Sequence, residues 1–158
     1  MNASDNKYPR ERRSAARLGA VQALYQMDLS GSDVGETLAQ FSARAVGENF
    51  EDGQCGEADY RHLKEVVDGV VREQKAIDPV VDQILDKGWP LHRLDSTVRA
   101  ILRAGAYELM FMERVPARVA ISEYVDVADA FFGTEEPRFV NGVLDRLARQ
   151  KRPREFAA

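Results

Sequence analysis

Residues 96–112, which read STVRAILRAGAYELMFM, decide the fold. Apolar residues recur there at intervals of three and four, the spacing of one face of an α-helix. Small and apolar residues fill much of the other side, and a helix that is apolar nearly all round must be buried on several faces. We therefore expect the central helix of the domain here, capped by Asp95 and Ser96. Its periodic positions are Val98, Ile101, Leu102, Gly105, Leu109 and Met112.

The other apolar clusters follow the same helical period, and the alternating pattern of a β-strand is absent. The sequence therefore predicts an all-α fold, a single bundle of about seven helices. Pro79 is expected in the first turn of a short helix, where its missing N–H needs no partner, and Glu123 on an outer face. Besides the central helix, the expected helices cover residues 12–29, 34–46, 57–76, 78–87, 116–132 and 135–149, and an acidic loop covers 47–56.

The composition fits one soluble globular domain, with 158 residues, 44% of them hydrophobic and 30% charged. Residues 1–17 are polar and charged, without the apolar core of a secretion signal. The single cysteine, Cys55, forms neither an internal disulfide nor a metal-ligand pair. We therefore expect a cytoplasmic protein.

Charge is distributed unevenly along the chain. Residues 1–17 carry a net charge of +3 and residues 146–158 carry +4, so the stretch between them carries −11 in a chain of net charge −4. Basic ends on an acidic body indicate a localised contact with a polyanion, although charged termini are also commonly just solvated. The predicted organisation is a flexible basic arm over 1–11, a helical domain over 12–150 and a basic tail over 151–158, frayed beyond Lys151.

Catalytic patterns are missing from the sequence. His62 and His92 have no nucleophile nearby in the chain, and Cys55 has no adjacent cation to lower its pKa. The segment GSDVG at 31–35 lacks the lysine of a phosphate-binding loop. We expect neither an enzyme nor a cofactor or metal site.

The arginines near the N-terminus are better candidates for a binding role. Arg13 and Arg17 are four residues apart on a predicted helix, with Arg10 three residues before them. A guanidinium suits phosphate because its planar fork donates two parallel hydrogen bonds. Tyr25 and Phe139 lie at the edges of apolar stripes, and both contact with a ligand and core packing remain open for them. For Gly142 in its helix we favour close helix packing.

Three blocks of sequence resemble one family. They are residues 13–29, with AVQALY at 20–25 as their core, AILRAGAYEL at 100–109, and the run from 115 to 148, in which FVNGVLD at 139–145 is the most diagnostic piece. In content, order and spacing these blocks resemble the NusB family of transcription antitermination factors. The resemblance covers nearly the whole chain except about residues 33–88.

The resemblance implies two three-helix subdomains around the central helix, and a role in processive antitermination, mainly of ribosomal RNA. It implies binding of boxA RNA, usually as a heterodimer with the NusE ribosomal protein, within the transcription elongation complex. Matching positions imply RNA contacts for Arg10, Arg12, Arg13 and Arg17 and partner contacts for Tyr25 and Phe139.

The sequence departs from the family pattern in two places. Residues 14–16 interrupt the arginine run, and Val98 and Arg99 occupy a position that is often acidic. Two other functions stay open: an accessory to RNA modification, since NusB-like domains occur fused to ribosomal RNA methyltransferases, and a protein adaptor or homodimer whose basic ends are incidental.

Overall fold

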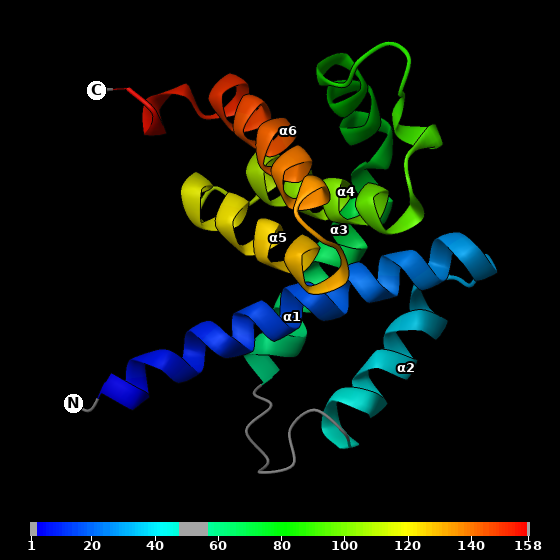
Figure 1. Ribbon diagram of the computed structural model, residues 1–158. Helices are drawn as coiled ribbons and strands as arrows, with labels where there is room; N and C mark the ends of the chain where they lie inside the picture. The colour runs from blue at the N-terminus through cyan, green and yellow to red at the C-terminus, as the bar shows by residue number, and fades with distance from the viewer. Residues whose placement is uncertain (1–2, 48–56, 158) are drawn as a thin grey trace. The chain divides into compact units, whose positions relative to one another are not determined.

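The computed structural model describes the backbone of residues 3–47 and 57–157 and the side chains of residues 14–40 and 60–157. All regular elements in these ranges are helices, which confirms the all-α class. Two compact units make up the chain, Met1–Asp68 and Gly69–Ala158. The first holds α1 (Ala3–Ser30), α2 (Val34–Gly47) and the start of α3 (Glu57–Ile84). The second holds the rest of α3, α4 (Ser96–Phe111), α5 (Ala117–Phe131), α6 (Glu135–Lys151) and the 3₁₀ turns η1 (Leu91–Arg93) and η2 (Pro153–Glu155) (Figure 1).

The described residues form six α-helices instead of about seven, because α3 is continuous through Pro79. A proline inside a helix removes one backbone hydrogen bond and normally kinks or breaks it. Here Ile77, Val81 and Ile84, on one face around the proline, are all buried. Burial of this apolar face offsets the lost bond, so the predicted helix break before residue 78 was wrong.

The N-terminal helix is longer than the sequence predicts. α1 begins at Ala3 instead of near Arg12 and therefore includes most of the segment expected as a flexible arm. Within α1, Ala16, Ala20, Val21 and Leu24 are buried, and their spacing places them on one face of the helix. The side chains before residue 14 lie outside the described part of the chain, and so does nearly all of the loop predicted over 47–56.

The central helix α4 has the buried character that its sequence predicts. Asp95 caps it, because its Oδ1 accepts hydrogen bonds from the backbone N–H of Thr97 at 2.9 Å and of Val98 at 3.3 Å. An added Cβ on Gly105 would lie 2.8 Å from the Cδ1 atom of Leu144 on α6. The glycine is therefore needed for the close approach of α4 and α6. Buried α4 residues are Val98, Ala100, Ile101, Leu102, Ala104, Gly105, Ala106, Tyr107, Glu108 and Leu109.

Helices α5 and α6 lie side by side and pack against α4 (Figure 1). Glu123 is 6% exposed, so the prediction that it faces outward was wrong. It lies one turn from Ala120 and from Val127, which are both buried, and so belongs to the inner face of α5. The hydroxyl of Tyr124 on α5 and the carboxylate of Glu108 on α4 form a buried hydrogen bond across this interface.

The C-terminal tail is anchored, not frayed. Arg152 is 7% exposed and donates hydrogen bonds to the carbonyl oxygens of Glu108 at 2.9 Å, Leu109 at 3.0 Å and Met112 at 2.8 Å. These carbonyls end α4, where a helix leaves its last acceptors unpaired. Because the partners are some forty residues apart in the chain, local sequence patterns gave no sign of this anchor.

Candidate RNA-binding and partner-binding residues

Arg17, one of the four predicted RNA contacts, belongs to the buried face of α1. It is 2% exposed, lies one turn before Ala20 and Val21, and has an interaction partner inside the protein. A buried guanidinium is not presented to an incoming phosphate, because a phosphate contact requires access from solvent. We therefore assign Arg17 a packing role in this structure, and its RNA contact stays an untested prediction.

The other three predicted RNA contacts are placed only by their backbone. Arg10, Arg12 and Arg13 lie on α1, one to two turns before Arg17. Their side chains lie outside the described residues, so their geometry adds nothing to the sequence argument. A helix that carries three guanidinium groups within four residues nevertheless concentrates positive charge at one end of an otherwise acidic protein.

Tyr25 is a partly exposed aromatic residue in the last turns of α1. Its exposed fraction is 38%, and Leu29, one turn further along, is 62% exposed. Gln26, between them, donates a hydrogen bond to the side chain of Gln40 on α2 at 2.7 Å, which ties this end of α1 to its neighbour. The pair Tyr25 and Leu29 therefore forms an exposed apolar surface on a braced helix end, a type of surface suited to a protein partner.

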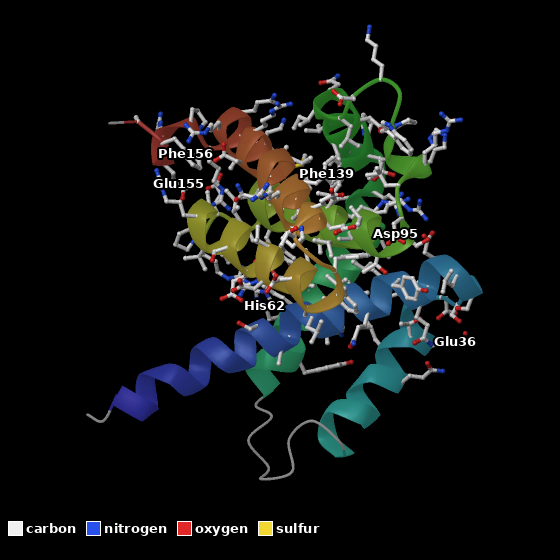
Figure 2. The ribbon with its side chains drawn as sticks, in the orientation of Figure 1. Glu36, His62, Asp95, Phe139, Glu155 and Phe156 are labelled. Carbon is white, nitrogen blue, oxygen red and sulfur yellow. The ribbon has the colours of Figure 1, made fainter. Side chains whose placement is uncertain are left out.

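Phe139 occupies a comparable position in the second unit, near the start of α6 (Figure 2). It is 39% exposed, although the neighbouring Val140 is fully buried. One turn further, Gly142 is exposed, and an added Cβ there would meet nothing within 4 Å. The expectation that Gly142 allows close helix packing was therefore wrong. Its open backbone lies on the solvent side of α6 beside the exposed ring.

Two of the five basic residues in the C-terminal cluster, Arg149 and Arg152, form internal contacts. Besides the anchor at Arg152, the guanidinium of Arg149 forms an ion pair with Asp145 at 2.9 Å and lies 4.7 Å from the centre of the Phe156 ring. Arg118 of α5 lies over the same ring at 5.2 Å. Part of the positive charge that suggested a second polyanion contact thus stabilises the fold, while Arg146, Lys151 and Arg154 are exposed.

A short loop between α3 and α4 contains a binding candidate that the sequence reading missed. Its Trp89 is 63% exposed, and Lys87, His92 and Arg93 around it are exposed as well. The usable signal was the aromatic residue between Gly88 and Pro90, two residues typical of loops, with cations on either side. Helical periodicity, on which the sequence reading relied, contains no information about such a loop.

Neither a membrane span nor a metal cluster is found in the part of the chain that the structure describes. No helix there is long and apolar enough to cross a bilayer. No group of three or more histidine, cysteine, aspartate or glutamate side chains could hold a metal ion in these ranges. What the described residues offer is a set of exposed aromatic side chains on a helical scaffold.

Comparisons with known proteins agree with this picture. A model of the NusB family matches residues 14–149. The chain is 53% identical over 145 residues to the transcription antitermination protein NusB of Rhodopseudomonas palustris strain HaA2, covering 92% of this chain and 86% of the relative. The solved structure of T. maritima NusB matches with a TM-score of 0.77 and 27% identity, over 91% of this chain and 96% of that chain. A structure of antitermination factors NusB and NusE in complex with double-stranded RNA matches with a TM-score of 0.72 and 29% identity. The match covers 89% of this chain and 98% of that chain.

The fold and the exposed residues define a helical binding protein. The chain belongs to the NusB family, which confirms the resemblance seen in the sequence. It is accordingly a non-enzymatic transcription antitermination factor of an RNA-binding family.

Proposed function

We propose that this protein binds boxA-type single-stranded RNA together with a NusE-type ribosomal protein, as part of the transcription elongation complex on ribosomal RNA operons in the cytoplasm. The observation that carries the RNA ligand and the partner is the similarity, over 89% of the chain, to a NusB solved with NusE and double-stranded RNA. The choice of a single-stranded boxA element rests on the family resemblance of the sequence. In this role the protein carries out no chemistry, and binding alone alters the fate of the transcript.

We assign the phosphate contacts to Arg10, Arg12 and Arg13. Cations that neutralise phosphates release counterions, so affinity falls as salt rises, with a logarithmic slope of about −0.7 per contact for a single strand. Sequence recognition then comes from unstacked bases, whose edges are accessible only in single strands. We assign the partner contacts to Tyr25 and Phe139, which are both partly exposed aromatic residues on helices.

Fluorescence anisotropy of a labelled boxA-like RNA tests the proposal. The RNA is titrated with the protein alone and with an equimolar NusE-type protein, beside a scrambled strand and a duplex of the same sequence. We expect tighter binding to the boxA strand when the partner is present. Equal binding to all three RNAs, unaffected by the partner, would leave only a nonspecific basic helix.

Variants of the arginines then locate the RNA contacts. The triple change of Arg10, Arg12 and Arg13 to glutamine should weaken binding and reduce the salt slope by about 2. Arg138→Gln, at an exposed arginine on α6, is the matched control and should leave the slope unchanged. The same loss of slope in both variants would refute the assignment to α1.

A further inference from the structure

Trp89 is unusually exposed for so large an apolar side chain, and contact between its ring and water costs free energy. Tryptophan carries the largest apolar surface of any residue and is usually well buried on average. Here it is 63% exposed, the largest exposed fraction among the described large hydrophobic residues. Leu91, which follows Pro90 and begins η1, is only 2% exposed. The loop thus buries its leucine and leaves its tryptophan in solvent.

The backbone that carries Trp89 is firmly held. The Trp89 N–H donates to the carbonyl oxygen of Asp86 at 2.9 Å, and the Leu91 N–H donates to Asp82 Oδ1 at 2.7 Å. On the other side, the Arg99 guanidinium donates to the carbonyl oxygen of His92 at 3.1 Å. Because the backbone is already fixed, binding at the indole does not require the loop to be ordered, and this lowers the entropic cost of binding.

The charge around the ring identifies the class of ligand. Residues 87–94 contain Lys87 and Arg93 and no acidic residue, within a stretch, residues 18–145, that carries a net charge of −11. Three carboxylates lie near this segment in the chain: Asp82 and Asp95 both accept backbone hydrogen bonds, and Asp86, directly before Lys87, is exposed. An exposed aromatic face with cations on either side matches the way proteins bind single-stranded nucleic acid, by stacking on bases and pairing with phosphates.

We propose that Trp89, together with Lys87 and Arg93, forms a second RNA-binding site, in which one unpaired base stacks on the indole and the flanking phosphates contact the two cations. The site deepens the proposed RNA-binding function and rests on it. It lies in the second unit, whereas the arginines of α1 lie in the first. The transcript thus has a base-stacking contact on a part of the chain separate from the basic helix.

Trp89 is the only tryptophan of the chain, so its emission reports this site alone. The protein is titrated with unlabelled boxA-like RNA while tryptophan fluorescence is recorded, and binding is measured in parallel by anisotropy. We expect quenching with the same midpoint as the anisotropy curve. Binding by anisotropy with unchanged emission would overturn the Trp89 site and leave the proposed function standing.

Two further outcomes separate the alternatives. If anisotropy shows no RNA binding even with the partner, the proposed function and the site fail together. If a NusE-type protein alone changes the emission and RNA adds nothing, Trp89 is a protein contact and the RNA site is refuted.

Variants measure the contribution of each group. Trp89→Ala should weaken RNA binding roughly 5- to 150-fold, the range seen when a stacked base loses its aromatic partner, and Trp89→Phe should restore part of it. Lys87→Gln with Arg93→Gln should lower the magnitude of the salt slope by about 1.4. Phe131→Ala, at an aromatic residue that is 42% exposed on α5, is the control and should change neither. Equal effects of Trp89→Ala and Phe131→Ala would contradict the proposal.

Discussion

Arg152 donates a hydrogen bond from Nη2 to the carbonyl oxygen of Met112 at 2.8 Å, and thereby joins the end of the chain to the end of α4. We predict that Arg152→Ala lowers the free energy of unfolding by about 2–4 kcal/mol, because several carbonyls lose their donor at once. Arg152→Lys should lower the free energy of unfolding less, because the lysine ammonium can replace some of the hydrogen bonds of the guanidinium group. Urea denaturation followed by circular dichroism measures both, and an alanine variant within about 0.5 kcal/mol of the parent would contradict the anchor.

A second prediction concerns pH and Glu155, which lies beside Phe156 at the C-terminal end (Figure 2). Its Oε1 accepts the backbone N–H of Ala117 at 2.8 Å and its Oε2 contacts Arg152 at 2.9 Å. First the backbone hydrogen bond and then the arginine lower the pKa of this carboxyl below its ordinary value near 4.5. A carboxylate with a lowered pKa contributes stability above its unfolded pKa and loses it as the pH falls through the folded value.

Glu155→Gln should therefore be slightly less stable than the parent at pH 7, by less than about 1 kcal/mol because the carboxylate is partly exposed. The difference should shrink as the pH falls below the ordinary glutamate range. Thermal melts from pH 7 to strongly acidic buffer measure it, and a difference that stays constant with pH would refute the assigned pKa shift.

Two helical glycines should respond oppositely to the same change. Gly105→Ala places a Cβ 2.8 Å from the Leu144 side chain, which is fully buried, and should destabilise the protein by about 1–3 kcal/mol. Gly142→Ala meets nothing within 4 Å and should stabilise it by about 0.5–1 kcal/mol, because alanine favours the helix. Thermal melts of the two variants decide this, and shifts of the same sign would contradict the packing described for α4 and α6.

The exposed aromatics should matter for the partner and not for the fold. Tyr25→Asp and Phe139→Asp should each weaken association with a NusE-type protein at least about tenfold, as expected for aromatic anchors of an interface. Their helical circular dichroism should stay unchanged. Val119→Asp, at a residue 44% exposed on α5, serves as the control. A loss of helical signal in the aromatic variants would instead support the alternative that these rings serve core packing.

The sequence predicted the central helix and its cap well, because α4 and Asp95 depend on local spacing and local hydrogen bonds. It did not predict the burial of Arg17 or the anchoring by Arg152, because charge alone favours exposure and the partners of Arg152 lie far away in the chain. Continuity of α3 through Pro79 likewise depends on tertiary burial that outweighs a local penalty.

Among the candidate binding residues too, some could be predicted from the sequence and others depend on tertiary structure. Motifs identified the family and pointed to Tyr25 and Phe139, which the structure finds partly exposed. Trp89 was missed because its exposure results from how the loop is braced, by Asp82 and Arg99 among others, and not from any repeat in the sequence.

The antitermination role is tested most directly by transcription in vitro through a terminator placed downstream of a boxA element, with and without this protein and a NusE-type partner. The fraction of full-length transcript is measured on templates with intact and scrambled boxA. We expect increased readthrough only when protein, partner and intact boxA are all present. Readthrough that is unaffected by the protein, or equal on both templates, would contradict it.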